Sequence, residues 1–99
     1  MSKITKSSQG KTCKVRIPGY CNFNPETTVA AHINSVRFGH GTGHKVNDLF
    51  IADCCSSCHD VLDYRVRSNF TTAELKLMQY EGVFETQLRL IEDGLVVIK

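Results

Sequence analysis

No run of apolar residues in this 99-residue sequence approaches the roughly 18 that a membrane-spanning helix requires, which excludes such a helix. The first six residues, Met1 to Lys6, also lack the apolar core of a secretory signal. We therefore expect a cytoplasmic protein without a membrane partner. Thiols stay reduced in that compartment, so the five cysteines predict metal binding and not disulfides.

The sequence also has little net charge, +2, which is too small to indicate a nucleic-acid partner by itself. The charges are unevenly distributed, however, because five bases precede the first acid, Glu26, and acids outnumber bases from Thr71 onward. This asymmetry predicts a one-sided positive face. Residues 1–12 are polar and lysine-rich, which predicts a flexible basic lead-in or one helical turn. Residues 13–99 are expected to form a single domain.

The middle of the chain has the pattern of a small α+β fold. Residues 27–33 are β-branched and apolar and predict a strand that carries His32. The glycines of residues 39–44 exclude a helix and predict a loop. A short apolar run at 49–52 predicts a second strand, and residues 56–68 predict a helix without breakers. Together these elements predict a ββα unit over about residues 27–68.

The last third of the chain predicts an additional C-terminal helix over about residues 71–94. Thr71 and Glu74 have the spacing of a capping box, and Gly94 is a typical residue after a helix end. Apolar residues recur at intervals of three and four, which places them on one face of the helix. We expect this stripe to form core or the interface of a homodimer; it consists of Leu77, Tyr80, Phe84, Leu88 and Ile91.

Two pairs of cysteines predict a structural zinc site. Cys55-x2-Cys58 presents two sulfurs from one turn, at the separation that a tetrahedral ion requires. Cys13 and Cys21 flank a Pro-Gly turn, which can bring their sulfurs together. Cys54 could replace Cys55 as a ligand. We prefer Cys55, because Cys54 would then end the second strand as a small buried hydrophobe.

Two histidines complete the pattern. His32 lies on the first predicted strand, and His59 opens the helix that follows the second. In a ββα arrangement the helix packs across both strands, so we expect both imidazoles on one face. Hydrolysis of a phosphodiester requires a base that activates water and a cation that neutralises the phosphate. Imidazole can serve as the base or as the ligand of the cation, so this pair predicts such chemistry.

The motifs and their order resemble the HNH, or ββα-metal, nuclease superfamily. More closely, they resemble the YbcO-like nuclease family of phages and prophages, through Cys-x-Val-Arg-Ile-Pro-Gly-x-Cys-Asn, Asn-Pro-Glu-Thr, Ala-His-Ile, Gly-Thr-Gly-x-Lys, Asp-Leu and Cys-Ser-x-Cys-His-Asp. The resemblance implies that His32 is the general base and that His59 binds a catalytic ion, Mg²⁺ or another divalent cation. It implies that Asp48, or else Asn47, orients the base, and that the four cysteines hold zinc.

Other ligand sets for the catalytic ion remain open: His59 with Asp48, His32 itself, or help from His40 or His44. Asp63 shares a helix face with His59 and is a candidate to orient its ring. The side chains predicted to contact the phosphate backbone of DNA are Arg16, Arg37 and Lys45, with Arg65 and Arg67 as further candidates.

These expectations define a metal-dependent endonuclease that hydrolyses DNA in a bacterial host, in phage recombination or DNA processing. The alternative is a non-catalytic, zinc-stabilised adaptor that binds nucleic acid or a protein. It is motivated by Ala31, which stands where many members of the HNH superfamily carry a second metal ligand.

Overall fold

The computed structural model describes residues 2–33, 37 and 47–99. The predicted glycine-rich loop, His40, His44 and Lys45 lie outside these residues. Within the described part of the chain, no helix is long and apolar enough to cross a membrane. The predicted α+β order of two strands followed by two helices is confirmed. The elements are α1 (Lys3–Lys6), a 3-10 turn η1 (Pro25–Thr27), β1 (Val29–His32), β2 (Ile51–Cys54), α2 (Ser56–Leu62) and α3 (Thr72–Glu92).

The two strands form an antiparallel sheet in which His32 pairs with Ile51 and Ala31 with Ala52. Both strands begin two residues later than predicted, because polar turns precede them. The Asn47 side chain accepts from the Leu49 N–H at 2.8 Å, and the Asn47 carbonyl accepts from the Phe50 N–H at 2.9 Å. In front of β1, the Asn24 side chain caps η1. The hydrogen bonds of these turns occupy backbone N–H and C=O groups that would otherwise pair between β1 and β2, so the sheet is shorter than predicted.

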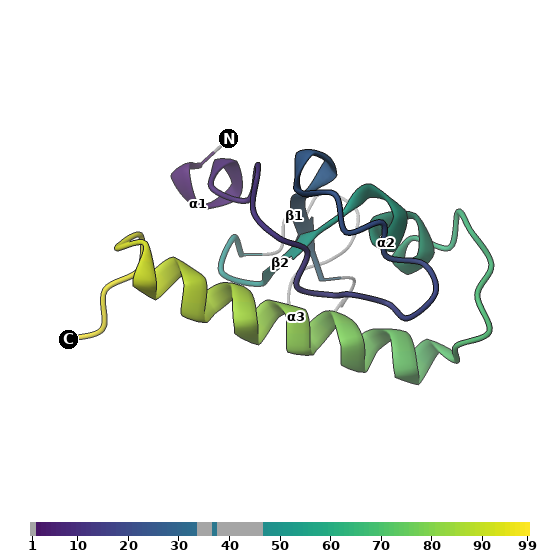
Figure 1. Cartoon of the computed structure of the whole chain (residues 1–99). Helices are drawn as coiled ribbons and strands as arrows, with labels where there is room; N and C mark the ends of the chain where they lie inside the picture. The colour runs from purple at the N-terminus through teal and green to yellow at the C-terminus, as the bar shows by residue number, and fades with distance from the viewer. Residues whose placement is uncertain (1, 34–36, 38–46) are drawn as a thin grey trace.

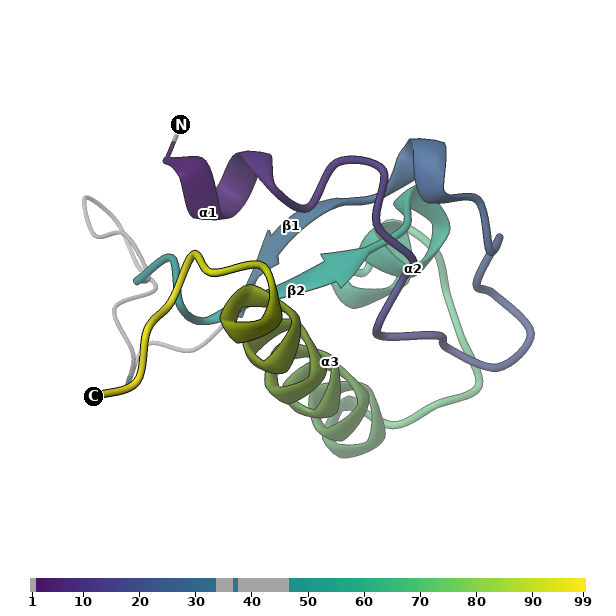
Figure 2. The ribbon, with the colours of Figure 1, turned by 60° about the vertical axis from the view of Figure 1, so that its left-hand side comes forward.

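The long helix α3 packs along β2, as Figures 1 and 2 show from two sides. Its predicted start is confirmed, since Thr71 and Glu74 form the reciprocal capping box. Leu75, Val83 and Leu90 are buried on the face that meets the rest of the protein. The helix approaches the sheet most closely at Gly82, where an added Cβ would lie 3.0 Å from Val15 Cγ2 and 3.3 Å from Ala52 Cβ.

Replacing this glycine should destabilise the protein, although alanine is the better helix former. Gly82→Ala gains about 1 kcal/mol of helix propensity. The new methyl group would also be pressed against Val15 and Ala52, and overpacking of that kind costs roughly 1–3 kcal/mol. We expect a net loss of about 1 kcal/mol in the free energy of unfolding, measured by urea denaturation. Glu81→Ala, at an exposed position one residue earlier, is the control and should change it little. A more stable Gly82→Ala protein would contradict the close approach.

A buried ion pair connects α1, β2 and α3. Asp53 in the middle of β2 has no exposed surface, and its two carboxylate oxygens accept from Arg89 Nε at 2.6 Å and Nη2 at 2.9 Å. Thr86 Oγ1 accepts from the Asp53 N–H at 2.9 Å. Arg89 Nη2 also donates to Ser7 Oγ at 3.1 Å, and this contact docks the segment that contains α1. No pattern in the sequence predicts this network.

Four of the five residues in the apolar stripe of α3 lie outside the core, so the core prediction was wrong for them; only Tyr80 is half-buried and packs against the core. Leu77, Phe84 and Leu88 are 60%, 64% and 62% exposed, and Ile91 is 37% exposed. The opposite face of α3 is buried although it includes small and polar residues. Close packing and hydrogen bonds make their burial possible. These residues are Gln79, Gly82, Thr86 and Arg89. A homodimer through the exposed stripe stays a prediction.

Helix α2 ends at Leu62, six residues earlier than predicted. Tyr64 adopts a positive φ of 61° and stops the helix. The Tyr64 N–H donates to the Val61 carbonyl at 3.1 Å, and the Arg65 N–H donates to the Asp60 carbonyl at 2.9 Å. These two bonds make a Schellman motif, in which the left-handed position is usually glycine.

Candidate functional site

Four sulfur atoms lie together at the start of α2. The Sγ atoms of Cys13, Cys21, Cys55 and Cys58 are all within 4.8 Å of one another, and those of Cys21 and Cys55 are 3.8 Å apart. Tetrahedral coordination with Zn–S bonds of about 2.3 Å requires sulfur atoms about 3.8 Å apart. The two predicted pairs therefore converge, and the cluster can hold a metal ion such as zinc.

Backbone groups surround the cluster in a way that suits thiolate ligands. The Arg16 N–H donates to Cys13 Sγ, the Ile17 N–H to Cys58 Sγ and the Cys58 N–H to Cys55 Sγ, each at 3.4 Å. Such donors offset the negative charge of coordinating sulfur. Arg16 has a positive φ of 47°, a turn within the segment that carries the first two of these N–H groups.

Cys54 lies beside this cluster but outside the set of four. Its side chain is fully buried, and its Sγ donates weakly to the Cys55 carbonyl at 3.5 Å. Hydrogen bonds with Cys13 and Cys58, together with burial, raise the pKa of the Cys54 thiol far above its usual range. Because its sulfur lies outside the set of four, the geometry favours Cys55 over Cys54 as a ligand.

The predicted base is paired with the predicted carboxylate. His32, the last residue of β1, has its Nε2 atom 2.9 Å from Asp48 Oδ1, and both side chains are more than one third exposed. A carboxylate at this distance favours the tautomer with the proton on Nε2. The lone pair is then on Nδ1. Asn47, the other candidate, uses its side-chain oxygen in the turn before β2 and so has a different role.

His59 is held in a similar way on α2. Its Nε2 atom lies 3.2 Å from Asp63 Oδ2, one helical turn later, as the spacing predicts. Asp63 Oδ2 is also 3.2 Å from Arg65 Nη2, and Arg65 Nε donates to Asp60 Oδ1 at 3.0 Å. This chain of charged groups fixes the orientation of the imidazole and leaves its Nδ1 atom for another ligand.

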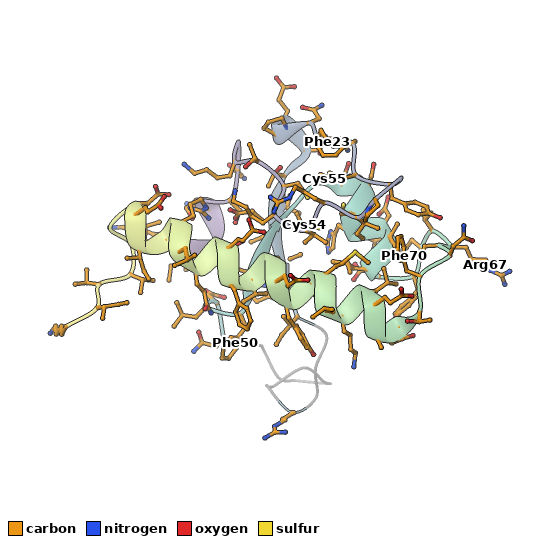
Figure 3. All side chains as sticks on the ribbon, turned by 60° about the horizontal axis from the view of Figure 1, so that its bottom comes forward. Phe23, Phe50, Cys54, Cys55, Arg67 and Phe70 are labelled. Carbon is orange, nitrogen blue, oxygen red and sulfur yellow. The ribbon has the colours of Figure 1, made fainter. Side chains whose placement is uncertain are left out.

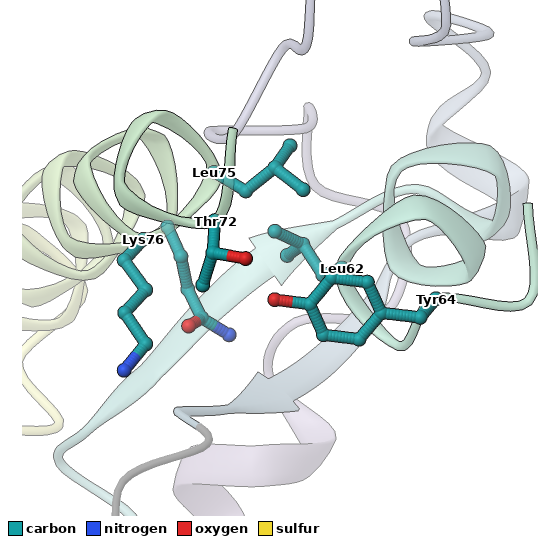
Figure 4. A pocket seen from close by; sticks show the side chains of 6 residues that line it. Leu62, Tyr64, Thr72, Leu75 and Lys76 are labelled. Carbon is teal, nitrogen blue, oxygen red and sulfur yellow. The ribbon is translucent and has the colours of Figure 1, made fainter. Parts of the chain in front are cut away.

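A pocket of about 250 Å³ lies between α2 and α3 (Figure 4). It is connected to the first histidine through Gln79, which lines it and donates from Nε2 to the His32 carbonyl at 3.5 Å. The sequence does not predict this pocket, because the residues that line it follow no motif and come together only through the packing of the two helices. They are Leu62, Tyr64, Thr72, Leu75, Lys76 and Gln79.

The predicted phosphate contacts have different surroundings. Arg16 is about half exposed and pairs with Glu85 of α3, with Nη2 at 2.8 and 2.6 Å from the two carboxylate oxygens. Arg37 is exposed. Arg67 extends outward from the segment that links α2 and α3 (Figure 3). Arg16 therefore joins the cysteine loop to α3, and its predicted contact with DNA would require it to share or leave Glu85.

Comparisons with known proteins find relatives along nearly the whole chain. The family described as "Putative nuclease YbcO" matches residues 2–95. Proteins of that name from Escherichia coli K12 and from Enterobacteria phage 82 are each 41% identical over 97 residues, which cover 97% of this chain and 98% of the relative. A solved structure, described as a "putative bacteriophage protein" from Escherichia coli K-12, superposes with a TM-score of 0.77 at 37% identity and covers 92% of this chain and 99% of that one. The chain therefore belongs to the YbcO family.

Proposed function

We propose that this protein is a metal-dependent endonuclease of the HNH type that hydrolyses phosphodiester bonds in DNA. The observation that carries the proposal is the contact of 2.9 Å between His32 Nε2 and Asp48 Oδ1 at the end of β1. It lies in the same small domain as a second histidine–carboxylate pair on α2 and a cluster of four sulfurs. The nuclease name of the relatives supports the same conclusion.

In this proposal His32 is the general base. Asp48 accepts from Nε2–H, holds the ring in one orientation and stabilises the positive charge that develops when the ring is protonated. The Nδ1 atom then accepts the proton of the attacking water. Since the ring is more than one third exposed, water and a phosphate group can reach it.

His59 is the proposed ligand of the catalytic cation, through Nδ1, with Asp63 positioning the ring from the other side. A divalent cation bound there, Mg²⁺ or another, would neutralise charge on the phosphate and on the leaving oxygen. The four sulfurs would hold a separate structural zinc ion, which fixes the first turn of α2 and thereby the position of His59.

The proposed substrate is DNA, bound through its phosphate backbone by Arg37, Lys45 and Arg16. Arginine and lysine contacts to phosphate give binding with little sequence preference that weakens with salt. Because one relative is a phage protein, we propose a role in phage recombination or DNA processing in the cytoplasm of a bacterial host.

The first test is cleavage of supercoiled plasmid by the purified protein in Mg²⁺ or Mn²⁺. We expect nicked or linear product that disappears when EDTA is added, because the proposed mechanism requires a divalent cation. The readout is agarose electrophoresis over a time course. Intact plasmid in every divalent cation tried would contradict the proposal.

A second candidate function is a zinc-stabilised adaptor that binds nucleic acid without cutting it. Ala31 favours it, because this residue is 2% exposed and pairs with Ala52 inside the sheet, so a methyl group stands next to the proposed base. The plasmid assay distinguishes the two functions. An adaptor would bind the plasmid, slow its migration in a gel and leave it uncut in every cation.

A further inference from the structure

The backbone at Tyr64 is unusual for a residue with a side chain. Its φ of 61° places it in the left-handed region, at the position of the Schellman motif that ends α2. The same motif ends α3, where Gly94 has a φ of 75° and donates to the Ile91 carbonyl at 3.1 Å. Left-handed geometry is unfavourable for any residue with a Cβ, so α3 has the favoured residue and α2 does not.

Burial of the ring does not account for this tyrosine. The residue is 62% exposed, so it gains little from the hydrophobic core. Residues held in sparsely populated backbone regions occur most often at functional sites, where the surrounding structure maintains them. Burial therefore gives no reason for a tyrosine here, and the reason has to lie in what surrounds the ring.

The ring borders the pocket between α2 and α3. Figure 4 shows it reaching from the end of α2 toward α3, beside Leu62. Leu62 and Leu75 give the pocket apolar walls, while Thr72, Lys76 and Gln79 bring a hydroxyl, an ammonium and an amide. Its volume of about 250 Å³ is below the roughly 300–1,000 Å³ of pockets that hold drug-sized ligands. The pocket thus suits a small flat group with apolar faces, polar edges and a negative charge nearby.

We propose that this pocket binds one unstacked nucleobase of the substrate, with the Tyr64 ring as the stacking surface. Stacking of a base on an aromatic side chain tolerates any sequence, because every base has two flat faces. Lys76 attracts the adjoining phosphate. The inference rests on the proposed function for the identity of the ligand, and it adds that the enzyme prefers single-stranded or locally unpaired nucleic acid.

The location of the pocket agrees with this role. Gln79, in its wall, bonds to the backbone of His32, and α2, which carries His59, supplies Leu62 to the opposite wall. A base held there would anchor the strand near the end of β1, where His32 lies. Extruding a base from an intact duplex has an energetic cost that is smallest at mismatches and in single strands.

The test compares Tyr64→Gly with Phe23→Gly. Phe23 is the matched control, since it is also an aromatic residue at a positive φ, 54°, is 74% exposed, and does not line the pocket (Figure 3). Glycine adopts a positive φ without steric strain, so each substitution should stabilise the protein and raise its melting temperature by about 4 °C. Only Tyr64→Gly should weaken binding of a fluorescent single-stranded oligonucleotide, by about tenfold, as measured by anisotropy at fixed salt.

Tyr64→Phe keeps the ring and should bind within about twofold of the wild type. Lys76→Met, on the opposite wall, provides a second variant and should weaken binding without the gain in melting temperature. Unchanged affinity in Tyr64→Gly, or an equal loss in Phe23→Gly, would overturn the base pocket even if the protein cuts DNA. Conversely, a tenfold loss in a protein that never cuts would support the pocket and contradict the nuclease.

Discussion

Removal of the metal by a strong chelator is expected to abolish the cooperative unfolding transition of this protein. Structural zinc sites contribute about 10–16 kcal/mol of apparent binding free energy. The whole stability of a domain of this size is roughly 5–15 kcal/mol. The metal-free chain should therefore be largely unfolded near room temperature.

The surroundings of the sulfur cluster give the reason for so large an effect. Cys13, Cys55 and Cys58 belong to the buried core, together with Val15 and Ile17. The sheet has only two strands, and an isolated pair of strands is marginally stable in water. Circular dichroism with and without chelator would measure the change, and elemental analysis should find one zinc ion per chain. An unchanged melting temperature after chelation would contradict a structural metal.

Two cysteine variants make this test specific. Cys58→Ser should lose the metal and unfold, because one ligand of the four is replaced. Cys54→Ala removes a buried thiol that lies outside the ligand set, so it should keep one zinc ion and lose only about 1–2 kcal/mol of stability. If both variants retained the metal equally, the assignment of the four ligands would be wrong.

His32→Ala is expected to reduce the rate of DNA cleavage by about 10²–10⁴-fold, the usual contribution of a general base. Since the imidazole is more than one third exposed, its loss should change the melting temperature little. Single-turnover cleavage of a labelled oligonucleotide at saturating metal would measure the rate. Wild-type rates in His32→Ala would contradict the assigned role.

Neighbouring variants separate the base from the residues that position it or hold the cation. Asp48→Asn keeps a hydrogen-bonding side chain of the same size but removes the charge that stabilises the protonated ring, so its loss should be smaller than that of His32→Ala. His59→Ala should instead raise the concentration of Mn²⁺ or Mg²⁺ needed for half-maximal rate. A metal dependence that is the same in His59→Ala and the wild type would assign the cation to other ligands.

Much of the fold and of the metal cluster could be predicted from the sequence, because short-range chemistry determines them. The spacing of Cys55 and Cys58, the turn between Cys13 and Cys21, and the cap at Thr71 each depend on a few adjacent residues. The strand ends and the end of α2 were less accurate. Their exact positions depend on local turns at Asn24, Asn47 and Tyr64 that compete with the regular elements.

The orientation of α3 could not be predicted from hydrophobicity alone. Several of its large apolar residues, such as Phe84 and Leu88, face solvent, while its buried face combines apolar residues with a glycine and an arginine. Gly82 is there because of the close approach of Val15, and Arg89 because Asp53 is buried opposite. Val15 and Asp53 each lie more than thirty positions from the helix residue that they contact, so no local sequence pattern reveals either contact.

The buried pair of Asp53 and Arg89 also determines when the protein can fold during synthesis. Arg89 follows Asp53 by 36 residues, and without its two hydrogen bonds the buried carboxylate in β2 would keep only the weaker pairing with Lys14, whose Nζ lies 3.6 Å from Asp53 Oδ2. The strands and α2 therefore reach their final packing only after α3 has been synthesised. For the same reason, the portion that carries both histidines is not a module that could be cut out and grafted onto another protein without α3.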